Sequence, residues 1–82
     1  MNVTILYFAA VRDLIGRGEE QVELPPPIDT IGALAAWLER NRPSLAGRLG
    51  SVRFARNEEF ATPSTGLEEG DVVALIPPVA GG

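Results

Sequence analysis

Two stretches of the chain are apolar at nearly every position. Residues 3–9 read Val-Thr-Ile-Leu-Tyr-Phe-Ala, and residues 72–76 read Val-Val-Ala-Leu-Ile. β-Branched and aromatic residues favour strands, and a strand that lacks polar alternation is typical of one that is buried on both faces. The pattern therefore predicts two central strands, one near each end of the chain.

Shorter strands are predicted between these two. Residues 21–24 alternate between outward polar and inward apolar side chains, which is typical of a half-buried strand. Gly16 and Gly18 indicate a turn within residues 12–18, so we expect the first two strands to form a simple hairpin. Three consecutive prolines, residues 25–27, end the second strand because proline cannot donate to the ladder.

The middle of the chain has the spacing of an amphipathic helix. Over residues 31–41 the apolar positions fall at i, i+3, i+4 and i+7, namely Ile31, Leu34, Ala35 and Leu38. Asp29 or Thr30 can supply the N-cap, and Pro43 favours an end just before it. We predict one main helix here, followed by a compact connector over residues 44–50.

The last third of the chain predicts a second hairpin and the final strand. Residues 52–55 form a third strand, Asn57-Glu58 is a tight turn, and a short strand lies near Phe60. The order strand, strand, helix, strand, strand, strand, with the two most apolar strands parallel at the centre, describes an α+β fold of the β-grasp (ubiquitin-like) type. We expect a mixed sheet of about five strands, a domain over residues 1–76 and an extended tail over residues 77–82.

One main helix can cover only one face of such a sheet. The first and last strands of the chain are nevertheless apolar on both faces. One apolar face of the sheet is therefore left without a cover. Uncovered apolar surface on a small domain usually marks an interface, and we expect Phe8, Phe60 and Ile76 to line it. The alternative is that the connector over residues 44–50 folds across this face.

Composition excludes most catalytic chemistry. The 82 residues contain no cysteine, histidine or lysine, and all seven cations are arginine. This removes thiol and Ser-His-Asp nucleophiles, Schiff-base chemistry and the usual metal ligands, so we expect no metal site. A net charge of −4 disfavours nucleic acid and anionic membranes as partners. No signal peptide or membrane span is recognisable, and a cytoplasmic location is expected.

The chemistry of the chain is expected at its end, in the sequence Pro77-Pro78-Val79-Ala80-Gly81-Gly82. Proline fixes φ, so Pro77 and Pro78 favour an extended approach, and two glycines can pass through a narrow channel of a partner enzyme. The reactive group would be the Gly82 carboxylate, which an ATP-dependent partner could adenylate before a sulfur donor displaces AMP. The alternative for a terminal Gly-Gly is a frayed end.

Two motifs resemble a known family, the small subunit of molybdopterin synthase. Residues 6–16, Leu-Tyr-Phe-Ala-Ala-Val-Arg-Asp-Leu-Ile-Gly, are similar to the family's opening strand and its Ala-x-x-Arg-(Glu/Asp)-Leu-x-Gly sequence. Residues 67–82 are similar to its ending, which combines a Leu-x-x-Gly-Asp turn, an apolar strand and Pro-Pro-Val-x-Gly-Gly. The turn at Asn57 also fits, so the resemblance spans essentially the whole chain.

The resemblance implies a sulfur carrier for molybdenum cofactor synthesis. An E1-like adenylyltransferase would activate Gly82, and the resulting thiocarboxylate would enter the large subunit of the synthase and give its sulfur to precursor Z (cyclic pyranopterin monophosphate). The family synthase is a heterotetramer. The chain itself would bind no cofactor, since ATP and the sulfur donor are used by the activating partner. By match, Phe8, Phe60 and Ile76 would contact partners.

One charged residue departs from the family pattern, and two further charged features have two interpretations each. Arg56 stands where the family is usually apolar, so it either lies on a solvated face or alters a partner contact. Arg12 matches a family arginine and is either a partner contact or a solvated surface residue. An acidic run beside the tail, read as a solvated turn or as a means of steering a basic partner, comprises Glu68, Glu69 and Asp71.

Other functions remain open at this point. The same carrier chemistry could serve thiamine synthesis, cysteine synthesis or tRNA thiolation. A non-catalytic β-grasp adaptor would use the fold without the tail. A stand-alone enzyme is the least favoured, because the chain lacks catalytic groups.

Overall fold

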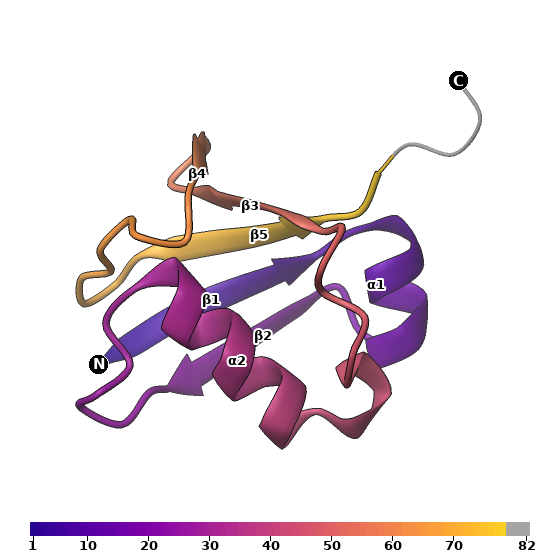
Figure 1. Cartoon of the computed structure of the whole chain (residues 1–82), viewed down its shortest axis with the longest axis horizontal. Coiled ribbons are helices and arrows are strands. Elements are labelled where there is room, and N and C mark those ends of the chain that lie inside the picture. Colours follow the sequence, from indigo (N-terminus) through magenta and orange to yellow (C-terminus); the bar gives the residue numbers. More distant parts are fainter. Residues whose placement is uncertain (79–82) are drawn as a thin grey trace.

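The sheet has five strands in the order β2-β1-β5-β3-β4. In the computed structural model, which describes residues 1–78, the strands are β1 (Asn2–Tyr7), β2 (Glu19–Glu23), β3 (Arg53–Arg56), β4 (Glu59–Ala61) and β5 (Val72–Ile76). β1 and β5 lie side by side and parallel at the centre (Figure 1), and all other neighbours are antiparallel. The predicted pairing of the first and last strands is confirmed.

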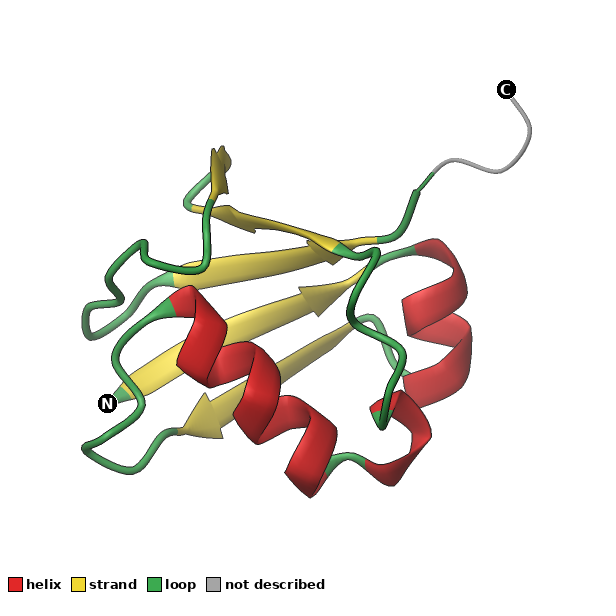
Figure 2. Ribbon diagram, in the orientation of Figure 1, coloured by secondary structure: helices red, strands yellow, loops and turns green. Residues whose placement is uncertain are grey.

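A single long helix, α2 (Ile31–Asn41), lies across one face of the sheet (Figure 2). The Thr30 hydroxyl accepts a hydrogen bond from the backbone N–H of Ala33 at 3.2 Å, which makes Thr30 the N-cap. Ile31, Leu34 and Leu38 are buried, as the apolar spacing predicts. The helix, its bounds and the β-grasp arrangement are therefore confirmed.

The predicted simple hairpin between the first two strands is wrong. β1 and β2 do pair, with Val3 opposite Val22, but a short helix, α1 (Ala9–Ile15), lies between them in the sequence. Gly16 ends it in the left-handed region at φ 86°, and its N–H donates to the Arg12 carbonyl. The sequence does contain a signal for this helix, because residues 9–15 include several good helix formers and are followed by Gly16. Because α1 begins at Ala9, β1 ends two residues earlier than predicted.

The connector after α2 belongs to the helix side of the sheet. It contains a short 3-10 helix, η1 (Pro43–Leu45), and it buries Leu45 and Leu49 in the same core as the inner side chains of α2. The backbone N–H of Leu49 donates to a carboxylate oxygen of Glu39 on α2 at 3.2 Å. The alternative in which the connector covers the open face is therefore wrong, because its two leucines are anchored on the other side.

Inner residues of the central strands form the middle of the core. Ile5, Tyr7, Val73 and Leu75 are at most 2% exposed and face α2. The Tyr7 hydroxyl donates to Glu20 at 2.7 Å, and Glu20 is paired with Arg42 just beyond α2. Burial and the neighbouring Glu20 carboxylate raise the pKa of Tyr7 well above its usual range. A satisfied polar network thus ties the end of α2 to β1 and β2 within an apolar core.

Candidate docking groove

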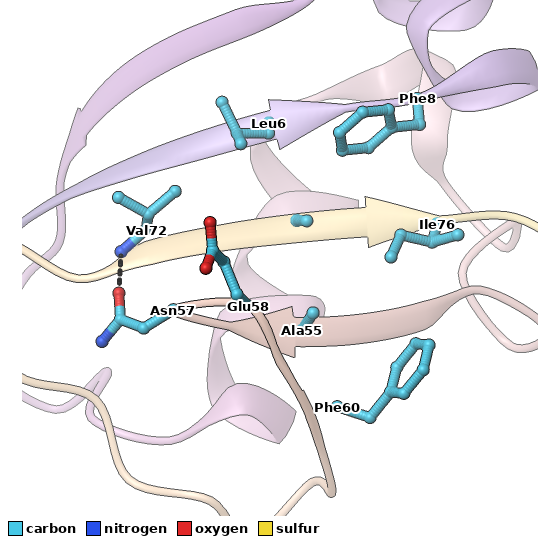
Figure 3. A pocket seen from close by; sticks show the side chains of 9 residues that line it. Leu6, Phe8, Ala55, Asn57, Glu58, Phe60, Val72 and Ile76 are labelled. Carbon is cyan, nitrogen blue, oxygen red and sulfur yellow. Dashed lines mark hydrogen bonds between the residues drawn. The ribbon is translucent and has the colours of Figure 1, made fainter.

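An apolar groove runs over the sheet face opposite α2 (Figure 3). Successive side chains of a strand point to opposite faces, so the neighbours of the buried core residues form this surface. The groove has a volume of about 580 Å³ and is lined by Leu6, Phe8, Ala55, Asn57, Glu58, Phe60, Val72, Ala74 and Ile76. No segment within residues 1–78 fills it.

The three residues predicted for this face come together from three different parts of the fold. Phe8 lies at the junction of β1 and α1, Phe60 on β4 and Ile76 at the end of β5 (Figure 3). Phe60 is 66% exposed and Phe8 45%, which is high for large apolar side chains. Sequence reasoning therefore located the open face and three of the nine residues that line the groove.

Arg12, the fourth predicted contact, is not part of the groove. It is exposed on α1, and its side chain passes beside Gly18, where an added Cβ would lie 3.4 Å from the guanidinium carbon. The groove and Arg12 are therefore separate features of the surface.

The turn between β3 and β4 fixes one end of the groove. Asn57 and Glu58 both have positive φ, 48° and 72°, as a type I′ hairpin requires. The Asn57 side chain accepts from the Val72 N–H at 2.9 Å and donates to Asp71 at 3.0 Å, so one amide joins the turn to the start of β5. Because the hairpin is anchored there, Phe60 is held beside the groove.

Arg56 has an intramolecular partner. Its Nε donates to Asp71 Oδ2 at 2.6 Å, and its terminal nitrogen lies 3.1 Å from Glu68. Ala55 lines the groove, so its neighbour Arg56 faces the other way. The unusual arginine therefore stabilises the acidic turn before β5, and the prediction that this turn lies beside the tail is wrong: it is at the opposite end of β5. Asp71 is buried, not solvated.

Hydrogen bonds control the charge state of Asp71. Burial alone would raise the pKa of its carboxyl, but hydrogen bonds from Arg56, the Glu68 amide and Asn57 outweigh that effect and leave the pKa below its ordinary value of 3.8. The carboxylate is thus ionised at neutral pH and has several donors around it.

The other end of the groove is where the chain leaves the sheet. β5 ends at Ile76, opposite Arg53 of β3. Pro77 is half-buried and Pro78 is exposed, whereas the predicted tail residues Val79, Ala80, Gly81 and Gly82 lie outside the described residues. Among residues 1–78, no helix is long and apolar enough to cross a membrane, and no three potential metal ligands gather.

The strand order, the helix across one face and the open apolar groove define a ubiquitin-like β-grasp protein with a surface suited to binding another protein. A family model described as the ThiS family matches residues 5–82, and the chain belongs to this family.

Curated relatives align over the full length. The molybdopterin synthase sulfur carrier subunit of Mycobacterium tuberculosis is 40% identical over 83 residues, covering 100% of this chain and 99% of the relative. The subunit of the same name from Chlamydomonas reinhardtii is 36% identical over 84 residues and is covered completely, as is this chain.

Solved structures give the same picture. SAMP1 from Haloferax volcanii has a TM-score of 0.85 at 26% identity, with all of both chains covered. A protein–protein complex of subunits 1 and 2 of molybdopterin-converting factor from Helicobacter pylori contains a chain with a TM-score of 0.71 at 28% identity, again with full coverage of both.

Proposed function

We propose that this chain is the sulfur carrier subunit of molybdopterin synthase, and that its Gly82 thiocarboxylate donates sulfur to precursor Z. The observation that carries the proposal is the full-length similarity to sulfur carrier subunits of that name, at up to 40% identity. The Gly81-Gly82 ending and the groove beside the exit of β5 fit the same function.

The chemistry is supplied by partners, since the chain has no cysteine, histidine or lysine. An E1-like adenylyltransferase joins the Gly82 carboxylate to the α-phosphate of ATP and releases pyrophosphate. A sulfur donor then attacks the acyl carbon, and AMP leaves with one of the original carboxylate oxygens. The net change is the replacement of one oxygen by sulfur. In this scheme Pro77, Pro78, Val79 and Ala80 would lead to the reacting end. Gly81, which has no side chain, would leave room around it.

The large subunit of the synthase is the proposed occupant of the groove. A similar chain has been solved in a complex with its second subunit, and an exposed apolar surface of this size is suited to protein binding. Phe8, Phe60 and Ile76 would bury their side chains against that partner, while Arg12 would contact a partner from outside the groove. The proposed location is the cytoplasm, where ATP is available to the activating enzyme.

One alternative has a structural basis. The fold is shared by SAMP1 and by the molybdopterin-converting factor chain, so it does not by itself distinguish this carrier from one that delivers sulfur to another pathway. A non-catalytic adaptor would also share it. The three functions differ in what happens at Gly82 and in which partner binds.

Intact mass spectrometry tests the carrier chemistry. After incubation with a cognate E1-like enzyme, ATP and sulfide, we expect the mass gain of one oxygen replaced by sulfur, located at Gly82. Two controls are a reaction without ATP and a variant that lacks Gly81-Gly82. Neither sample should show the mass gain. Adding the large subunit and precursor Z should then return the carrier to its original mass with formation of molybdopterin.

Two results would contradict the proposal. An unchanged mass, with the enzyme active on another carrier, would exclude sulfur transfer and leave the adaptor. If the thiocarboxylate forms but is not discharged by the large subunit and precursor Z, the carrier serves another pathway.

A further inference from the structure

The apolar groove has opposite charges at its two ends. Glu58 lines the end where β5 begins. Arg53 does not line the groove but borders its other end, because it pairs with Ile76, the last residue of β5, and directly opposed residues share a face. The four residue steps from Val72 to Ile76 separate the two ends by about 13 Å at the rise of a strand.

The carboxylate of Glu58 is held over the groove by the hairpin turn. Glu58 occupies a left-handed position at φ 72°, and Figure 3 shows its side chain directed across the groove toward β5. It makes no ion pair within residues 1–78, whereas the nearby Glu68 and Asp71 are paired with Arg56. A partner that covers the groove must therefore dehydrate this carboxylate or supply a cation for it.

The guanidinium of Arg53 is positioned by an aromatic ring. Its central carbon lies 4.6 Å from the centroid of the Phe60 ring, within the range of a cation–π interaction. No carboxylate is paired with Arg53 among the described residues. The positive charge is thus fixed beside the most exposed apolar side chain of the groove, at the end from which the chain leaves the sheet.

We propose that this charge polarity sets the orientation of the partner in the groove. The partner is a protein surface with a basic side chain that meets Glu58, an acidic side chain that meets Arg53, and apolar side chains between them. This inference rests on the proposed function, in which that partner is the large subunit. A partner turned end for end would place like charges together, and such contacts are strongly unfavourable in interfaces. The tail therefore leaves toward one defined end of the partner surface.

Charge reversal at Glu58 is the first test, with Glu59 as the matched control. Glu59 pairs with Arg56, so it lies on the opposite face of the same hairpin. Both Glu58→Arg and Glu59→Arg change the net charge equally. Calorimetric titration of the full-length variants with the large subunit should give a Kd raised by about tenfold or more for Glu58→Arg. For Glu59→Arg we expect about twofold or less.

A double reversal separates polarity from net charge. Glu58→Arg combined with Arg53→Glu leaves the net charge unchanged and inverts the polarity. We expect it to bind more weakly than either single variant. Arg53→Lys keeps the positive charge but loses the planar stacking on Phe60, so it should raise the Kd less than Arg53→Glu does. Circular dichroism of each variant checks the fold.

The outcomes distinguish the two proposals. If the original chain binds the large subunit and the double reversal binds equally well, the polarity inference is overturned and the proposed function stands. Equal effects of Glu58→Arg and Glu59→Arg would also overturn it, as a general charge effect. If the original chain does not bind the large subunit at all, both proposals fail.

Discussion

At the scale of single residues, Asp71 is the one charged residue that is fully buried among residues 1–78. It is 5% exposed and accepts hydrogen bonds from the Arg56 side chain, the Glu68 amide and the Asn57 side chain. Because its pKa is lower in the folded state than in the unfolded chain, its contribution to stability is complete above the unfolded value of 3.8. That contribution is lost as the pH falls through the folded value.

Replacing this carboxylate by an amide should therefore have a pH-dependent cost. We expect Asp71→Asn to lower the free energy of unfolding by about 1–3 kcal/mol at pH 7, measured by urea denaturation. The deficit relative to the original chain should shrink as the pH falls below about 4. Asp13→Asn removes an exposed carboxylate on α1 and should have little effect at either pH. A deficit that stays constant down to pH 2 would contradict this account.

The Arg56–Asp71 pair also shows the limit of sequence reasoning at this scale. The residues are 15 positions apart, and only the antiparallel pairing of β3 with β5 brings them together. From sequence, Arg56 was an exception to a family pattern, and Asp71 was one of several acids. The turn at Asn57, by contrast, could be predicted, because a residue type that tolerates positive φ was enough.

At the scale of elements, α1 is the segment that the pattern of apolar residues did not predict. Its seven residues are too few for a clear apolar stripe, and only Val11 is fully buried. Its end is specified by Gly16, which has φ 86° and no other atom within 4 Å of the position of an added Cβ. Any side chain at this position is therefore disfavoured by the backbone conformation alone and not by crowding.

A pair of glycine substitutions tests this local specification. Gly16→Ala should lower the free energy of unfolding by about 1 kcal/mol because alanine is strained in the left-handed region. Gly50→Ala is the matched control. A Cβ added at Gly50 would also have no other atom within 4 Å, but Gly50 does not have a positive φ. It should be neutral or slightly stabilising. The melting temperatures of both variants, measured by thermal unfolding, test this difference. Equal melting temperatures would contradict the assignment of Gly16 as the cap.

At the scale of the whole molecule, the two faces of the sheet have different purposes. Phe54 is 7% exposed and packs in the core on the side of α2, whereas Phe60, six positions later, is 66% exposed on the groove. The same residue type thus supports folding on one face and is available for binding on the other. A small domain tolerates such exposure when a partner covers it.

Alanine substitutions at the two phenylalanines should separate stability from binding. Phe54→Ala should lower the free energy of unfolding by about 3–5 kcal/mol, which is a large part of the total for a domain of this size. Phe60→Ala should change it by about 1 kcal/mol or less but raise the Kd for the large subunit by about thirtyfold. Urea denaturation and calorimetric titration measure the two effects. Unchanged binding by Phe60→Ala would remove the groove from the interface.

The main architecture and the position of the open face can be read from the amino-acid sequence alone. Apolar runs over residues 3–9 and 72–76 predict the central strands, because strands buried on both faces lack polar alternation. The helical spacing over residues 31–41 predicts α2, because one face of a helix repeats every 3.6 residues. Because one helix can cover only one face of the sheet, Phe8, Phe60 and Ile76 could also be assigned to the uncovered face. The Gly-Gly ending and the family motifs pointed to sulfur carriage before any geometry was known.

The folded chain was needed to establish which side the connector covers and which charges are paired. These features depend on contacts between residues far apart in sequence, such as Leu49 with Glu39 and Arg56 with Asp71, and local propensity carries no information about them. The polarity of the groove has the same origin. Arg53 and Glu58 become its two ends only when β3, β4 and β5 pair in register, because pairing determines which side chains share a face.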